Sequence, residues 1–163
     1  DNYLLVFLSP DVTNGKYLTE ISLEQLSWLE KTLTANKTSP TLIFFHAPLA
    51  GTLASYNKDA NTPNFVAQPE KQLHDLLMNN PQILLWVSGH THTPATNPSF
   101  DTPINFYEGK ILDLHNPTLD GKTIWTNSIY LYPDKISIRT YNHQTGEFVE
   151  NLDRTIPITF TAK

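Results

Sequence analysis

Three short apolar runs mark the first half of the chain, and each stops at a polar or turn-forming residue. They are YLLVFLS at 3–9, TLIFF at 41–45 and ILLWVS at 83–88. Each run is too short for an ordinary helix, and unbroken hydrophobicity is typical of a parallel strand that is covered on both faces. The pattern therefore predicts three buried strands.

Two intervening segments place apolar residues at helical spacing. ISLEQLSWLEKTL combines a Ser-x-x-Gln capping box with leucines three and four residues apart, which predicts a helix over roughly 22–36. PEKQLHDLLMNN begins with Pro69, whose ring suits the first turn of a helix, and Pro81 follows its end. Strand, helix, strand, helix, strand is the order of an α/β fold.

The pattern changes after Pro94. Segments such as KILDLH, KTIWTNSIYLY and KISIRTYN are rich in strand-forming residues and are joined by turn signals, which predicts β-strands. At 163 residues the chain is the size of one domain. We expect a single domain, residues 1–163, with an α/β part at 1–94 and a β-rich part at 95–163.

Composition narrows the classes of partner and chemistry. The net charge is −5 and the basic residues form no cluster, which argues against a nucleic-acid-binding patch. No apolar run reaches the ~18 residues of a membrane helix, so a soluble protein, cytoplasmic or exported, is expected. Without cysteine, a metal site would have to use His, Asp, Glu or Asn. The first residues carry neither Met nor a signal-peptide pattern, so we expect a piece of a longer chain.

Three histidines stand where a predicted buried strand gives way to a loop. His46 follows the second apolar run, and His90 and His92 follow the third. In open α/β sheets ligands gather at the carboxyl ends of the strands, and imidazole is a good ligand for divalent transition metals. A single strand-end histidine is more often a structural residue, but three at equivalent ends favour a metal site. Gly89 is expected to give the turn a conformation that a side chain would forbid.

Residues 47–68 lie between the second strand and the second helix and contain Gly51, Pro63 and several asparagines, which predicts a loop. A loop of this length inside one domain is usually functional, so we expect it to form a rim or lid over the site. Tyr56 and Asn57 on this loop are candidates for substrate contact.

The pairing of FFHAP with WVSGHTHTP, whose first histidines are 44 residues apart (90 minus 46), resembles the C-terminal half of calcineurin-like metallophosphoesterases. The resemblance extends from about Tyr3 to Pro94 and implies a partial metallophosphoesterase sandwich of α/β class. It also implies two divalent metal ions, Mn, Fe or Zn. His46 and His90 resemble ligands of one ion, and His92 resembles a ligand of the other. The implied reaction is hydrolysis of phosphate mono- or diesters, as in a phosphodiesterase, by a hydroxide between the metals.

The departure from that family is equally informative. Its members also use an Asp-x-His, a Gly-Asp-x-x-Asp and a Gly-Asn-His-Asp/Glu element, which precede the part seen here. This chain has none of them in the expected place, so the catalytic residues are expected outside it. The chain alone should then be nearly inactive and bind metal weakly, with the missing N-terminal half of the same protein as its partner. The absent strands would leave an exposed apolar edge that favours self-association.

Two late motifs imitate the missing elements. LDLH contains Asp113 and His115, and TYNHQ contains Asn142 and His143. A circular permutation could carry early motifs late, but no Gly-Asp lies between these two, and Tyr141 stands where a glycine is needed. We therefore expect ordinary strand residues, with Asp113 and His115 on an exposed strand face.

Two alternative functions remain. The chain could be a non-enzymatic ligand- or protein-binding module derived from the same fold. It could also hold one metal ion, with Asp101 or Glu108 completing the ligand set.

Overall fold

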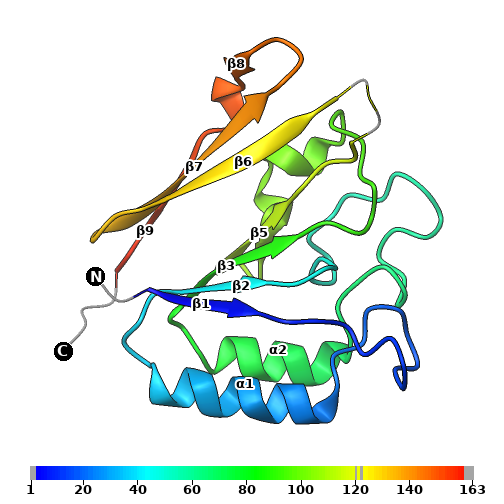
Figure 1. The fold of residues 1–163 in the computed structure, drawn as a ribbon, viewed down its shortest axis with the longest axis vertical. Helices are drawn as coiled ribbons and strands as arrows, with labels where there is room; N and C mark the ends of the chain where they lie inside the picture. The colour runs from blue at the N-terminus through cyan, green and yellow to red at the C-terminus, as the bar shows by residue number, and fades with distance from the viewer. Residues whose placement is uncertain (1–2, 120, 122, 160–163) are drawn as a thin grey trace.

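A computed structural model of the protein describes residues 3–119, 121 and 123–159, and its elements stack in three layers. A five-stranded sheet lies between a pair of helices and a smaller second sheet (Figure 1). The α-helices and strands are β1 (Leu4–Phe7), α1 (Leu23–Ala35), β2 (Thr41–Phe44), α2 (Glu70–Met78), β3 (Ile83–Ser88), β4 (Phe106–Tyr107), β5 (Ile111–His115), β6 (Trp125–Leu131), β7 (Lys135–Asn142), β8 (Glu147–Phe148) and β9 (Arg154–Pro157). Short 3-10 helices span Pro98–Asp101, Pro103–Asn105 and Glu150–Leu152. None of the helices in the described ranges is long and apolar enough to cross a membrane.

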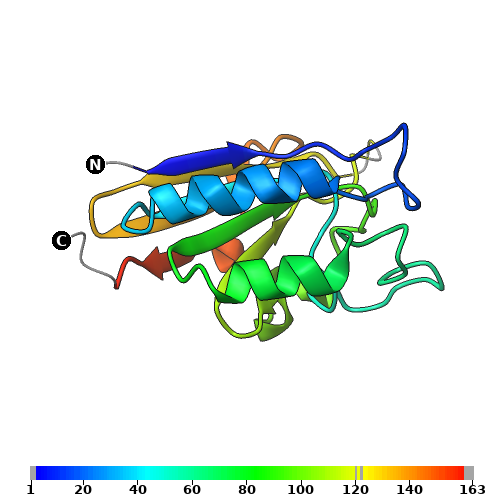
Figure 2. The same cartoon turned by 90° about the horizontal axis from the view of Figure 1, so that it is seen from below.

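Both helices form where the leucine spacing predicts them, and both pack on the same face of the first sheet (Figure 2). Ser22 caps α1 by accepting the backbone N–H of Gln25, which satisfies a donor that the helix itself cannot pair. The Gln25 side chain then exchanges two hydrogen bonds with the backbone of Ser9. This contact joins the start of α1 to the segment that follows β1.

The first sheet has the strand order β1-β2-β3-β5-β4, and β1, β2, β3 and β5 run parallel. Their carboxyl ends therefore lie along one edge, at the right of Figure 1. The three strands predicted from the apolar runs are confirmed. The expected cover on both faces is wrong for β1, where Leu5 and Phe7 are 46% and 68% exposed. In the described part of the chain β1 is one of the two edge strands of this sheet and pairs with β2 alone.

The first sheet also takes in β4 and β5, which come from the part expected to be β-rich. The division at residue 94 therefore does not coincide with the division between the two sheets. The expected exposed face of β5 is wrong, because Asp113 and His115 are 0% and 2% exposed. Their strand lies inside the sheet, between β3 and β4, where both faces are covered.

The second sheet is built from β6, β7, β8 and β9 and closes the other face of the first. A second apolar core fills the space between the sheets, separate from the core beneath the helices. Its buried members are Leu42, Leu84, Leu85, Leu112, Leu114, Ile136, Ile138 and Ile156. Strands β3 and β5 are thus held from both sides, which fixes the segments that follow them.

β1 has exposed aromatic surface, and its outer edge pairs with no other described strand. Both features predict self-association of the chain. The Phe7 ring stacks on Phe44 at 4.7 Å between ring centres and is still 68% exposed. We expect the wild-type chain to form concentration-dependent oligomers in sedimentation velocity, and Phe7→Lys to shift it toward monomer. Leu119→Lys is the matched control, because Leu119 is also 68% exposed but lies in the loop before β6. A strictly monomeric wild-type chain at high concentration would contradict the prediction.

Candidate metal centre

His46 and His90 meet at the carboxyl edge of the first sheet. His46 follows β2, His90 follows β3, and the two rings lie 4.5 Å apart between centres. Nε2 of His46 is 2.8 Å from Nδ1 of His90. Because β2 and β3 are parallel neighbours, the backbone also joins here: the Gly89 N–H donates to the His46 carbonyl at 3.0 Å. Two of the three predicted ligands are thus brought together.

The protons on this pair follow from the partner on the far side of His90. Nε2 of His90 lies 2.8 Å from the backbone carbonyl of Asn64, which only accepts, so Nε2 of His90 carries the hydrogen. In the neutral ring Nδ1 of His90 is then a bare acceptor, and it receives the Nε2–H of His46. One proton therefore occupies the space between two ring nitrogens that could both face a cation.

This geometry fits a shared metal ion. Both ring nitrogens could face one cation if the proton between them were lost, because an imidazole binds a metal through a deprotonated nitrogen. The contact from His90 to Asn64 is also of the kind that metal-binding histidines make. Such rings commonly donate their second N–H to a backbone carbonyl, which fixes ring orientation and tautomer. The arrangement of the pair is therefore compatible with a metal ligand role, which remains a prediction from the sequence.

The backbone of the turn after β3 is strained at the histidines. His90 and His92 have φ angles of 65° and 48°, in the left-handed region that costs residues other than glycine of order 1–3 kcal/mol. The expectation for Gly89 is wrong, since its φ is not in that region and an added Cβ would only touch the His46 carbonyl, at 3.9 Å. The unusual conformation falls on the histidines themselves, and such strain is typical of functional sites.

The turn has two faces. Thr91 and Thr93 are buried, with hydroxyl oxygens 2.7 Å apart, whereas His90 is half-buried and His92 is exposed. Threonine hydroxyls on the inner face and imidazoles on the outer face therefore alternate along the four residues.

Partial burial and the two neighbouring imidazole rings favour the neutral form of His46. Partial burial of the ring lowers the pKa of His46, and the nearby His90 and His92 rings lower it further. A neutral imidazole is the form that binds a metal. His92 thus lies close enough to influence His46. Within the described residues, however, no group of three or more His, Asp or Glu side chains is arranged to hold a metal ion.

The loop at 47–68 lies against the histidines, as expected of a rim. Besides the Asn64 carbonyl, the Phe65 ring lies 5.3 Å from the His90 ring, and the Tyr56 hydroxyl donates to the Thr91 carbonyl. Sequence reasoning missed Asn64 and Phe65, because a backbone carbonyl leaves no signal in the side-chain pattern. Asn57, the other loop candidate, accepts backbone N–H groups of its own turn.

The carboxylates of the one-metal alternative do not join this group. Glu108 precedes β5 and so lies at the opposite edge of the sheet, where its Oε1 is 3.8 Å from Nε2 of His74 on α2. The side chain of Asp101 lies outside the described part of the structure. His143 of the second late motif bonds Thr126 on β6, at 2.8 Å.

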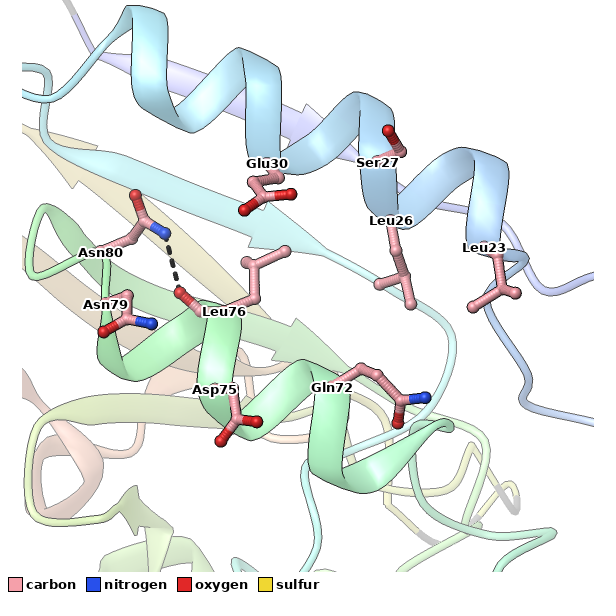
Figure 3. A pocket seen from close by; sticks show the side chains of 9 residues that line it. All are labelled: Leu23, Leu26, Ser27, Glu30, Gln72, Asp75, Leu76, Asn79 and Asn80. Atoms are coloured by element: carbon pink, nitrogen blue, oxygen red, sulfur yellow. Dashed lines mark hydrogen bonds between the residues drawn. The ribbon is translucent and has the colours of Figure 1, made fainter.

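A groove lies between α1 and α2, away from His46 and His90 (Figure 3). Leucine, amide and carboxylate side chains line it, with Glu30 and Asp75 as its charged members and no histidine. Asp75 is already paired with Lys71 at 2.5 Å, which lowers the pKa of Asp75. The groove therefore offers none of the chemistry found at the strand ends.

Comparisons with known proteins agree with this fold at a coarse level. No protein-family model and no curated protein matches the sequence. Among solved structures, the chain is similar to a dimetal phosphatase from Danio rerio, with a TM-score of 0.58 and 19% sequence identity. The similarity covers 84% of this chain and 38% of that chain. The chain therefore has a partial phosphoesterase-like α/β fold and spans well under half the length of that phosphatase.

The paired rings predict that His46 and His90 contribute jointly to metal affinity. We expect His46→Ala and His90→Ala each to weaken Mn²⁺ or Zn²⁺ binding by at least about tenfold in titration calorimetry, since even an outer partner of a ligand is worth that much. His74→Ala is the control, because His74 lies on α2 away from this edge. Equal affinity in all three variants would show that the histidine pair does not hold the metal.

Proposed function

We propose that this chain is the C-terminal part of a binuclear-metal phosphoesterase that hydrolyses phosphate mono- or diesters. His46 and His90 would hold one divalent ion and His92 would contribute to the second. The observation that carries the proposal is the facing pair of ring nitrogens, 2.8 Å apart, with His90 oriented by the Asn64 carbonyl. The likeness of the fold to a dimetal phosphatase gives it independent support.

The donor set suits Mn, Fe or Zn, which accept imidazole nitrogen readily. When bound, two such ions would supply Lewis acidity toward the phosphoryl oxygens and an acidified water as nucleophile. The residues of this chain would hold and orient the imidazoles, keep His46 neutral, and cover one flank of His90 with the Phe65 ring.

Three neutral imidazoles cannot balance the charge of two divalent ions. The described residues add no carboxylate to the histidines, and isolated cations in a partly buried site are costly without compensating charge. We therefore propose that the acidic ligands, and the group that protonates the leaving alcohol, come from the N-terminal half of a longer protein.

The absence of a three-ligand group among the described side chains also suits a second candidate. In this alternative the chain is a ligand- or protein-binding module that keeps the fold without the reaction. The sequence encoded before Asp1 separates the two, because the enzyme requires aspartate and asparagine ligands there.

Hydrolysis of bis(p-nitrophenyl) phosphate with added Mn²⁺ tests the proposal. We expect the isolated chain to stay at the rate of the metal-only blank, and a longer protein that includes the preceding segment to turn over. In that longer protein His46→Ala should reduce kcat/KM by at least about 100-fold, because metal stabilisation of the transition state is worth several kcal/mol.

His74→Ala in the longer protein should leave the rate unchanged. Turnover by the isolated chain would disprove the divided site. An inactive longer protein with bound metal would favour the non-enzymatic module.

A further inference from the structure

Behind the histidine pair, a group of polar side chains is sealed inside the fold. Asp113 and His115 of β5, Ser88 of β3 and Thr52 of the loop are each no more than 2% exposed. The Ser88 hydroxyl lies 2.7 Å from Oδ1 of Asp113 and 3.2 Å from Nδ1 of His115. Nε2 of His115 lies 3.0 Å from the Thr52 carbonyl. Neither the metal-binding proposal nor the sequence pattern accounts for this group.

The hydrogens in this group can be assigned by counting donors. The Thr52 carbonyl only accepts, so Nε2 of His115 must donate to it. If His115 is neutral, the Ser88 hydroxyl donates to Nδ1, and Asp113 must be protonated to donate to Ser88. If His115 is charged, its Nδ1–H donates to Ser88, which donates to an ionised Asp113. In both arrangements every partner is satisfied and the Asp–His pair carries no net charge.

A group with no net charge can be buried here at moderate cost, whereas a lone carboxylate could not. Burial raises the pKa of Asp113, while His115 and the hydrogen bonds from Ser88, Leu49 and Thr52 oppose the rise. Shared hydrogen bonding thus explains how an aspartate and a histidine are kept in the interior of the sheet.

The group also spans the two segments that carry the candidate ligands. Oδ2 of Asp113 accepts the Leu49 N–H at 2.7 Å, three residues after His46. Oδ1 contacts Ser88, which stands two residues before His90. A single carboxyl on β5 therefore joins the segment that follows β2 to the last residue of β3.

A second buried contact supports the same segment. Nε1 of Trp86, fully buried on β3, donates to the Ala47 carbonyl at 2.9 Å. The backbone on the carboxyl side of His46 is thus held at Ala47 and at Leu49, whereas the His46 side chain keeps contact with solvent. Movement of the backbone that carries His46 relative to the backbone of His90 therefore requires these buried bonds to break.

We infer that Asp113, with Ser88 and His115, is a positioning unit that sets the separation between the His46 and His90 rings. Its consequence for metal binding rests on the proposed function; its consequence for the rings does not. Asp113 and His115 touch neither histidine, so they act through the segments at 47–52 and 88–89.

Two substitutions at Asp113 distinguish the effect of its hydrogen bonds from the effect of the volume that its side chain fills. In Asp113→Asn the amide oxygen can accept from Leu49 and the amide N–H can donate to Ser88, as the protonated carboxyl does. Asp113→Leu has similar volume but leaves the Leu49 N–H unpaired. Ser88→Ala removes the hydroxyl that contacts both Asp113 and His115, and so breaks the link between β3 and β5 side chains. Thr140→Val is the matched control, because Thr140 is 3% exposed and its hydroxyl donates to Asn127 on β6, in the second sheet.

The first measurement is the ¹⁵N chemical shifts of the His46 and His90 rings in the metal-free chain. We expect Ser88→Ala and Asp113→Leu to change these shifts, and Asp113→Asn and Thr140→Val to leave them close to wild type. Amide spectra of β6 and β7 verify that each variant is folded. If Asp113→Leu does not fold, Ser88→Ala decides, since it removes one hydroxyl from an otherwise intact site.

The second measurement is Mn²⁺ affinity, where Ser88→Ala should lose about 10- to 100-fold and Asp113→Asn should remain within about threefold. Folded Ser88→Ala and Asp113→Leu variants with wild-type ring shifts would overturn the inference, as would an Asp113→Asn variant that behaves like Asp113→Leu. Failure of the wild-type chain to bind Mn²⁺ would count against the proposed function alone, because the ring shifts are measured without metal.

Discussion

The parallel alignment of β1, β2, β3 and β5 is the constraint on which the candidate site depends. Parallel strands must be covered on both faces, and here the two helices cover one face and the second sheet covers most of the other. The alignment brings every carboxyl end to one edge. Residues far apart in sequence, such as His46, His90 and His115, therefore follow or end neighbouring strands. Glu108 belongs to the turn that leads into β5, and the same alignment excludes it from this edge.

The buried Asp113–His115 group and the histidines at the surface differ in how their charge is balanced. The inner group, Asp113 with His115, balances itself and needs nothing from outside the chain. The outer group consists of imidazoles, which bind cations but supply no negative charge. A chain of this kind can fold around its own polar interior while its outer surface stays incomplete. The exposed edge at β1 is consistent with the same division, because it leaves hydrogen-bonding groups and aromatic surface available to further strands.

The sequence predicted the elements well where the signal was periodic. The leucine spacing in α1 and the apolar runs at β2 and β3 depend on neighbours within the segment, and the structure agrees with them. The alternation in ILDLH was misleading, because polar residues at every second position normally face water. Asp113 faces the interior only because its partners Leu49 and Ser88 come from distant segments. No local pattern carries that information.

In the candidate site, too, the sequence predicts the features that topology fixes and not those that depend on distant contacts. The three histidines were identifiable from their places after strands, since topology fixes where those places lie. The Asn64 carbonyl that orients His90 was not identifiable, because any residue type could supply it. The sequence predicts an unusual backbone conformation at Gly89, but the left-handed φ angles fall on His90 and His92, since a glycine permits that conformation without requiring it.

The alternation of threonine and histidine in the turn makes its register critical. Thr91 and Thr93 are buried and the imidazoles lie toward solvent, an alternation that the left-handed backbone at His90 and His92 produces within a turn. Inserting or deleting one residue before His90 would exchange the two sets, burying imidazoles in a space fitted to hydroxyl groups. Tolerance to changes in length should therefore be lower here than in the neighbouring loops, even though the turn lies at the surface of the protein.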